Sequence, residues 1–327
     1  MLTKSECRGV YPTMITPYCS DGKIDYEGVK KLTEWYWKQG CDGIFAACQS
    51  SEIRHLTSEE RTKLVQAVIS ERNRLEGLDS SGRKMRVVAS GHVSNRFDEQ
   101  VEELTGIASA KPDALILVTN RMDIAETGDK KWISDTEKLI SRLPSAIPLG
   151  LYESPEPYKR LLNENMLKWC AATNRFLFIK DTCCDEKMLA ARLNIIRESG
   201  MCLFNANSTT LLYSLRLGAS GFSGVMGNIH PKLYSELINT NYNSEKAALL
   251  QSYLGSASDF ALLAYPCCAK YYLNRYEQLP ISIHCRCRPT EDFTEYMRLT
   301  ADQYAKISKK AEEIFLNPSI KDQTPIL

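Results

Sequence analysis

The residues most able to do chemistry end one apolar run, Phe176–Asp181. Four large apolar residues lead directly into Lys180, which is typical of a strand buried on both faces. A lysine at the edge of an apolar core loses hydration, and this loss disfavours the charged ammonium. A neutral amine near pH 7 attacks carbonyl carbons and can form a Schiff base. The same pattern also suits a lysine that simply leaves the core for solvent.

Two further groups of side chains could act on the same substrate. Tyr152 ends the expected strand before Lys180, and its hydroxyl could carry protons to and from a carbon next to an imine. Ser50 and Ser51 follow the second expected strand and offer hydroxyl and backbone N–H groups that suit a carboxylate. Taken singly, Tyr152 could instead cap the core, and the two serines could only shape a loop.

These side chains need elements that bring them together, and the sequence predicts strands that alternate with amphipathic helices. The expected strands are Val10–Ile15, Gly43–Ala47, Arg86–Ser90, Ala114–Val118, Pro148–Tyr152, Phe176–Lys180, Cys202–Asn205 and Gly221–Val225. Helix signals separate them, such as Asp25 before and Gly40 after the first helix, and the capping box that begins at Thr57.

Eight strand–helix units predict an α/β fold, a (β/α)8 TIM barrel. We expect the barrel over residues 1–235 and a C-terminal helical extension packed on it over residues 236–327. The extension is helical in pattern over Ser244–Tyr276 and Thr290–Phe315. An open doubly wound sheet is the competing architecture, but no glycine-rich phosphate loop follows the first strand. In a barrel, catalytic groups gather at the carboxyl ends of the strands, so Lys180 and Tyr152 should face one mouth.

Composition and charge argue against several classes of protein. The chain has 327 residues, 43% of them hydrophobic, and a formal net charge of +1 without a dense basic block. We therefore expect no nucleic-acid partner and no membrane partner. The first seven residues lack the apolar core of a signal peptide, so we expect a cytoplasmic protein. The 12 scattered cysteines form no Cys-x-x-Cys pair, which favours free thiols over a metal site.

Several motifs resemble those of the dihydrodipicolinate synthase and N-acetylneuraminate lyase family of pyruvate-dependent class I aldolases. They span nearly the whole chain: Gly9-Val10 with Thr16-Pro17, the loop Cys48–Glu52, Tyr152-x-x-Pro155, Ile179-Lys180-Asp181, and Leu217–Gly221 with Asn228 and Pro231. The resemblance implies a (β/α)8 barrel with a helical extension. It also implies a homotetramer or homodimer that uses no metal and no organic cofactor.

The resemblance further implies a role for each motif residue. Lys180 would form the imine with pyruvate or another 2-keto acid, and Tyr152 would relay protons as the imine becomes an enamine. Ser50 and Ser51 would hold the pyruvate carboxylate. Two further residues would line the pocket through their backbone: Ala206 and Ser223.

The chain departs from the synthase pattern at three places. Gln49 stands where the synthase has the first loop threonine of its proton relay, and Met122 stands where it has a tyrosine lent by the neighbouring subunit. The synthase arginine after the Tyr-x-x-Pro motif falls near Pro157. These departures argue against lysine biosynthesis but leave the imine chemistry intact. Three basic residues could instead bind an acidic or hydroxylated acceptor: His92, Arg121 and Arg160.

We therefore expect an enzyme, a Schiff-base lyase or aldolase that makes or breaks a C–C bond next to a pyruvate-derived enamine. Its substrate would be a 2-keto-3-deoxy sugar acid, a sialic-acid-like compound, or that of 4-hydroxy-tetrahydrodipicolinate synthase. The altered relay at Gln49 and Met122 motivates a second hypothesis, in which a catalytically impaired barrel acts as a small-molecule binding or regulatory protein. A third, a cysteine-based redox or metal protein, depends only on the number of cysteines.

Overall fold

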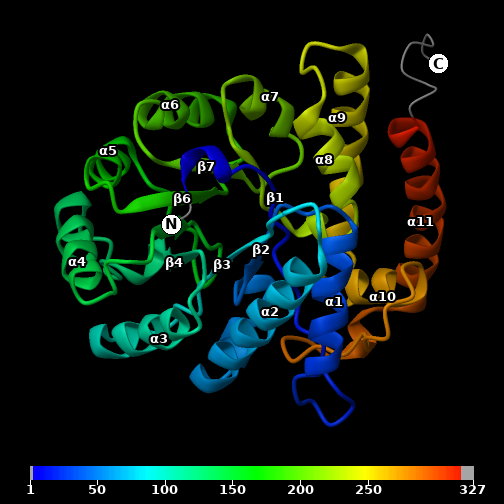
Figure 1. Cartoon of the computed structure of the whole chain (residues 1–327), viewed down its shortest axis with the longest axis horizontal. Helices are drawn as coiled ribbons and strands as arrows, with labels where there is room; N and C mark the ends of the chain where they lie inside the picture. Colours follow the sequence, from blue (N-terminus) through cyan, green and yellow to red (C-terminus); the bar gives the residue numbers. More distant parts are fainter. Residues whose placement is uncertain (1–2, 318–327) are drawn as a thin grey trace.

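The computed structural model describes residues 3–317, apart from the side chain of Ser5, and shows a ring of parallel strands surrounded by helices (Figure 1). The strands pair in the order β1-β8-β7-β6-β5-β4-β3-β2. They are β1 (Gly9–Val10), β2 (Gly43–Ala46), β3 (Arg86–Ala89), β4 (Ala114–Val118), β5 (Leu149–Tyr152), β6 (Phe176–Asp181), β7 (Cys202–Asn205) and β8 (Gly221–Phe222). The ring closes after β1, where Thr13 bridges Phe45 of β2. The predicted (β/α)8 barrel is confirmed.

Eight helices form the outer layer, and three more lie on one side of the barrel, next to α1 and α8 (Figure 1). The outer helices are α1 (Tyr26–Lys38), α2 (Ser58–Leu78), α3 (Phe97–Ser109), α4 (Asp129–Ser141), α5 (Glu164–Ala172), α6 (Glu186–Ile196), α7 (Leu211–Arg216) and α8 (Pro231–Asn239). The expected caps are present, because Asp25 accepts from the Gly28 N–H and Thr57 accepts from the Glu60 N–H. The extension consists of α9 (Glu245–Ala257), α10 (Cys267–Arg275) and α11 (Glu295–Leu316).

Three predicted elements differ from those observed. The first strand was expected to reach Ile15, but it ends at Val10, since Pro12 has no N–H to donate to the ladder. The last strand ends at Phe222, three residues early, and the chain continues into a 3-10 turn. The helix expected over Ser244–Tyr276 is interrupted before Pro266, whose ring cannot continue a helix.

Polar contacts join the C-terminal extension to the first two strand–helix units. The Trp35 indole N–H donates to Glu277 at 2.8 Å, and Lys270 forms a fully buried ion pair with Glu52 at 3.0 Å. The predicted domain boundary at residues 235–236 falls inside α8. The extension therefore lies directly beside the loop that follows β2, where two of the predicted site residues are found.

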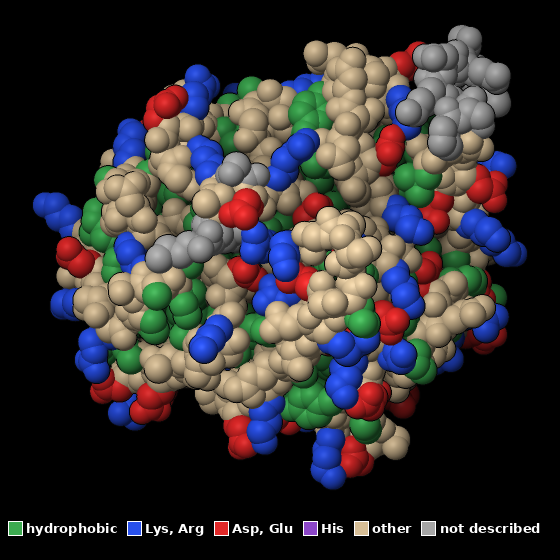
Figure 2. All heavy atoms as spheres, in the orientation of Figure 1, with side chains coloured by type: hydrophobic (Ala, Val, Ile, Leu, Met, Phe, Trp, Pro, Cys, Tyr) green, Lys and Arg blue, Asp and Glu red, His purple; other side chains and the backbone are tan. Residues whose placement is uncertain are grey.

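The surface carries mixed charge. Figure 2 shows lysine and arginine side chains interspersed with aspartate and glutamate over the visible face, in keeping with the net charge of +1. Among residues 3–317, none of the helices has the length and apolarity needed to cross a bilayer.

The barrel interior is filled by aromatic rings. Phe178 of β6 stacks on Phe204 of β7 with centroids 4.5 Å apart, and Tyr11 contacts Phe204 at 4.6 Å. Because side chains alternate along a strand, Phe178 and Lys180 point to the same interior face. Lys180 consequently lies one step above a closed apolar floor, at the end of β6 that faces the mouth.

The seam between β1 and β8 predicts a glycine requirement. Gly221 pairs with Gly9, and a Cβ built on Gly221 would lie 1.9 Å from the Gly9 carbonyl oxygen. We expect Gly221→Ala to lower the free energy of unfolding by about 1–3 kcal/mol or more, because backbone cannot yield as a flexible side chain can. Urea unfolding measures the loss. Gly200→Ala, with no atom within 4 Å of its new Cβ, is the matched control. Equal midpoints for the two variants would contradict this packing.

Candidate active site

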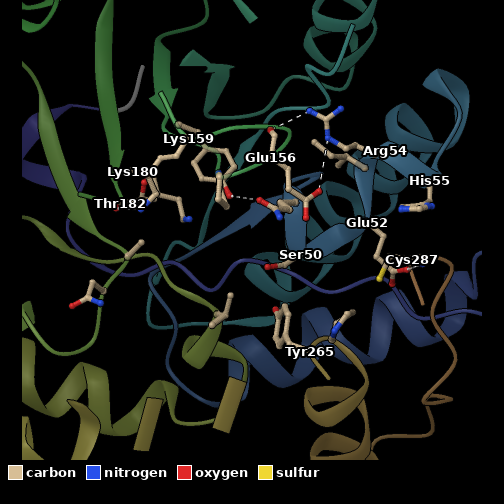
Figure 3. A pocket seen from close by; sticks show the side chains of 18 of the residues that line it. Ser50, Glu52, Arg54, His55, Glu156, Lys159, Lys180, Thr182, Tyr265 and Cys287 are labelled. Atoms are coloured by element: carbon tan, nitrogen blue, oxygen red, sulfur yellow. Dashed lines mark hydrogen bonds and ion pairs between the residues drawn. The ribbon is translucent and has the colours of Figure 1, made fainter. Parts of the chain in front are cut away.

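A cavity of about 420 Å³ opens at the carboxyl ends of the barrel strands. Figure 3 shows Lys180 on one side and Cys287 on the other, with Ser50 and Tyr265 between them. The lining therefore combines strand ends of the barrel with two segments of the C-terminal extension. This is the place where a TIM barrel is able to assemble an active site.

Lys180 and Tyr152 meet at this mouth. They are directly paired in the parallel register of β5 and β6, and both line the cavity. The Lys180 Nζ lies 4.2 Å from the centroid of the Tyr152 ring. The structure therefore brings the amine and the phenol together within reach of one small molecule.

Arg192 of α6 binds the two acids that follow the paired residues in sequence. Its Nη2 contacts Glu153 Oε1 at 2.6 Å, and its Nη1 binds Asp181. Glu153 and Asp181 are fully buried, and strand alternation turns them away from the interior face of Lys180. Burial opposes the charge of Arg192, but the two carboxylates outweigh it and raise the pKa of Arg192 above its usual value. Both acids are thus engaged on the helix side of the sheet.

Lys180 consequently stays without a carboxylate partner. Its side chain is 5% exposed, and no ion pair engages its Nζ within residues 3–317. Burial lowers the pKa of Lys180 to about 8, and the nearby carboxylates of Glu153 and Asp181 limit the shift. About a tenth of the amine is then neutral at pH 7, whereas an ordinary lysine is neutral in less than about one part in a thousand. The amine is prepared for attack on a carbonyl carbon.

The Tyr152 hydroxyl is held by Gln49. It donates to Gln49 Oε1 at 3.3 Å, and the Ser154 hydroxyl donates to the same oxygen at 3.3 Å. Burial raises the pKa of Tyr152, so the phenol remains protonated. An amide oxygen orients a hydroxyl but does not take up its proton at neutral pH. Ser154 was missed by the sequence analysis, although it lies two residues after Tyr152.

The two predicted carboxylate ligands differ in their position. Ser50 lines the cavity, and its hydroxyl donates to Thr13 Oγ1 at 3.0 Å. Ser51 is fully buried and lies outside the lining, with its hydroxyl donating to the Met14 carbonyl at 2.6 Å. Successive residues of the 3-10 turn Gln49–Ser51 point in different directions, so they cannot all face the mouth. The hydroxyl of Ser51 is thus engaged by the protein itself, and a contact between Ser51 and a substrate stays a prediction.

Ala206 and Ser223 also separate. Ala206 lines the cavity after β7, as expected. Ser223 follows β8, is fully buried and does not line the cavity. Its hydroxyl has no hydrogen-bond partner among the described residues. A role for the Ser223 backbone near the imine stays a prediction.

The basic residues considered for acceptor binding are structural. Arg160 forms an ion pair with Asp123 at 2.8 Å, and Arg121 donates to Asn120 Oδ1 at 2.9 Å. His92 accepts from the Val118 N–H at 3.1 Å, and burial lowers its pKa to about 4. None of the three side chains lines the cavity. These expectations were wrong because buried hydrogen bonds already occupy the polar atoms.

Met122, expected in the place of a tyrosine lent to a neighbour, is 2% exposed and packs in the apolar core of its own chain.

All 12 cysteines are free thiols. Among residues 3–317, no cluster of three or more histidine, cysteine, aspartate or glutamate side chains could hold a metal ion.

Parts of the sequence are similar to those of known proteins. Residues 6–74 match the model of the dihydrodipicolinate synthetase family. The 4-hydroxy-tetrahydrodipicolinate synthase of Methanothrix thermoacetophila is 25% identical over 232 residues, which cover 71% of this chain and 73% of that protein. Both matches agree with the resemblance to the dihydrodipicolinate synthase and N-acetylneuraminate lyase family that the sequence motifs indicate.

Two solved structures share the fold. A catalytic lysine mutant of the Ruminococcus gnavus sialic acid aldolase superposes with a TM-score of 0.82 at 17% identity, covering 96% of this chain and 100% of that one. The chloride-inhibited dihydrodipicolinate synthase of Acinetobacter baumannii, complexed with pyruvate, has a TM-score of 0.79 at 20% identity and covers 93% and 99%. At these identities the likeness establishes the barrel and its helical extension.

The environment of Lys180 predicts an unusual labelling profile. Acetic anhydride reacts with neutral amines, so acetylation of Lys180 should rise with pH and level off above about pH 8. Lys63, exposed and paired with Glu59 at 2.6 Å, has a raised pKa and should reach its plateau at higher pH. Peptide mass spectrometry over a pH series measures both residues. A midpoint for Lys180 at or above that of Lys63 would contradict the proposed desolvation.

The Arg192 clamp predicts a stability effect. Arg192→Met would leave two buried carboxylates without a cation, so we expect the free energy of unfolding at pH 7 to fall by about 3–5 kcal/mol. Arg192→Lys retains a charge but loses the fork geometry, so its free energy of unfolding should lie between those of Arg192→Met and the unchanged protein. Urea unfolding measures both variants against Lys187→Met, a change at an exposed position of the same helix. An unfolding midpoint for Arg192→Met equal to that of the control would rule out the clamp.

Proposed function

We propose that this chain is a class I aldolase or lyase of the dihydrodipicolinate synthase family, with Lys180 as the imine-forming residue and pyruvate as its donor. The single observation that supports it best is the desolvated, unpaired amine of Lys180 beside the Tyr152 phenol at a cavity mouth. The Ruminococcus gnavus sialic acid aldolase has a catalytic lysine, and the Acinetobacter baumannii synthase was solved with pyruvate. Neither a metal nor an organic cofactor is needed for this reaction.

In the proposed reaction, the neutral Lys180 Nζ attacks the keto carbon of pyruvate. The keto oxygen takes up protons and leaves as one molecule of water, and a protonated imine forms. This imine draws electrons from the neighbouring methyl carbon, which loses a proton and becomes an enamine. The enamine carbon then attacks an aldehyde carbon, whose oxygen takes up a proton. Water finally hydrolyses the imine and frees Lys180, and cleavage is the same sequence in reverse.

Tyr152 is the proposed proton carrier for these steps. Its raised pKa keeps the hydroxyl protonated, so it can donate a proton to the departing oxygen. Gln49 and Ser154 fix the direction of the hydroxyl. Because the Gln49 amide cannot itself pass a proton on, the phenol must exchange protons with the substrate or with water.

Ser50 is the proposed ligand of the pyruvate carboxylate. It lines the cavity between Lys180 and the C-terminal extension, and its hydroxyl can rotate from Thr13 to an incoming oxygen. A carboxylate held here would leave the adjacent keto carbon free to approach Lys180. Ala206 supplies a small wall on the β7 side, with its N–H already donated to the Asp181 carbonyl at 2.9 Å.

Reductive trapping tests the proposal. We expect sodium borohydride with pyruvate to leave a stable adduct on Lys180, because borohydride reduces the imine to an amine that cannot hydrolyse. Lys180→Ala should lose the adduct entirely, and Tyr152→Phe should form it at least about tenfold more slowly, since general acid–base catalysis contributes a factor of about 100 or more. Peptide mass spectrometry locates and counts the adduct.

Lys187→Ala serves as the control, because this lysine is exposed on α6 and lies outside the cavity. It should be trapped as fast as the unchanged protein. Absence of an adduct on Lys180 in the unchanged protein, with 2-oxobutyrate as well as pyruvate, would favour a barrel that binds small molecules without catalysis.

A further inference from the structure

Arg288 is a cation of the cavity wall that has no partner among the described residues. Arg288, from the segment between α10 and α11, lines the cavity. No hydrogen bond and no ion pair engages its guanidinium within residues 3–317, and its Nε is buried without a partner. A buried donor that lacks an acceptor costs about 1–3 kcal/mol, and more when it is charged. Such a group is therefore expected to meet an acceptor from outside the chain.

The segment that bears Arg288 is firmly positioned. The backbone N–H groups of Arg286 and Cys287 donate to Glu52 Oε2 at 2.6 and 2.9 Å, and Glu52 also pairs with Lys270 at 3.0 Å. The Arg286 side chain forms an ion pair with Glu60 at 2.7 Å. The two residues before Arg288 are thus tied to the loop that follows β2. Arg288 reaches the cavity from a fixed base.

The acids of the cavity cannot neutralise Arg288. Glu52 is already bound by Lys270 and by backbone N–H groups. Glu156 faces Arg54, with 3.9 Å between the closest charged atoms. A further cation, Lys159, donates only to a neutral acceptor, the Thr182 carbonyl, at 2.8 Å. The cavity therefore holds an excess of positive charge beyond that of Lys180.

Lys159 lies beside Lys180, whereas Arg288 belongs to the opposite wall of the cavity (Figure 3). Cys287, the neighbour of Arg288, faces Lys180 from the opposite side of the cavity, and Ser50 lies between them (Figure 3). We propose that Arg288 binds an anionic group, a carboxylate or a phosphate, at the end of the acceptor aldehyde remote from the reacting carbon. The inference rests on the proposed aldolase function and narrows its substrate class to acceptors with a second anion. A guanidinium suits both groups because its fork matches their paired oxygens.

The experiment compares acceptors that differ in charge. Pyruvate condensation is measured with succinic semialdehyde, with glyceraldehyde 3-phosphate and with neutral butyraldehyde, for the unchanged protein and for Arg288→Gln. We expect the variant to raise KM at least about tenfold for the anionic acceptor that the protein prefers, as is typical when a charge-assisted contact is removed. KM for butyraldehyde should change less than about twofold, and borohydride trapping of pyruvate should not change. The preferred acceptor distinguishes a carboxylate from a phosphate.

Arg96→Gln is the matched control, since Arg96 is exposed at the start of α3 and lies outside the cavity. Equal changes for anionic and neutral acceptors in Arg288→Gln, or no preference for an anion in the unchanged protein, would overturn the proposal. Calorimetric titration with glutarate and with glycerol 3-phosphate separates this failure from failure of the aldolase function. An anion that binds the unchanged protein and is lost in Arg288→Gln supports the Arg288 site even without trapping at Lys180. Failure of both anions to bind an enzyme that traps pyruvate overturns the site alone.

Discussion

The chemistry of the site depends on the ion pairs that Arg192 forms with Glu153 and Asp181. Glu153 and Asp181 each follow a residue of the proposed catalytic pair, and either carboxylate would raise the pKa of Lys180 further if it pointed into the cavity. Strand alternation turns both toward α6, where Arg192 binds them in a buried cluster. Removing one partner from such a cluster is costly, so the acids are held there strongly. Desolvation is then the largest influence on the pKa of Lys180, and it favours the neutral amine.

The barrel makes that desolvation possible. The aromatic rings of Tyr11, Phe178 and Phe204 close the interior below the amine, so solvent approaches only from the mouth. A packed interior is also rigid, because interiors at close-packed density have little room to rearrange. The direct pairing of Tyr152 with Lys180 fixes the phenol relative to the amine without any flexible loop. The sheet therefore determines both the position of Tyr152 beside Lys180 and the protonation state of the Lys180 amine.

Much of this was predictable from the sequence, for a definite reason. The eight strands, most helix starts and the meeting of Lys180 with Tyr152 follow from hydrophobic periodicity and from the rule that strand ends share one mouth. The hydrogen-bond partners of individual side chains were not predictable, because those partners are distant in the chain. Ser51 and Ser50 look equivalent in the sequence, but Ser51 donates to the carbonyl of Met14, in the segment that follows β1. His92 suggested a ligand and is instead a buried neutral group.

The same reasoning explains why Arg288 escaped notice and why it is informative. It lies 108 positions after Lys180 in a segment without strand–helix periodicity, so no barrel rule places it at the mouth. The contacts of Glu52 and the ion pair between Arg286 and Glu60 bring that segment to the cavity. The barrel thus fixes where a keto acid reacts, whereas the extension supplies a cation on the far wall. Substrate choice in this chain can therefore change through residues outside the barrel, while the amine and its clamp stay as they are.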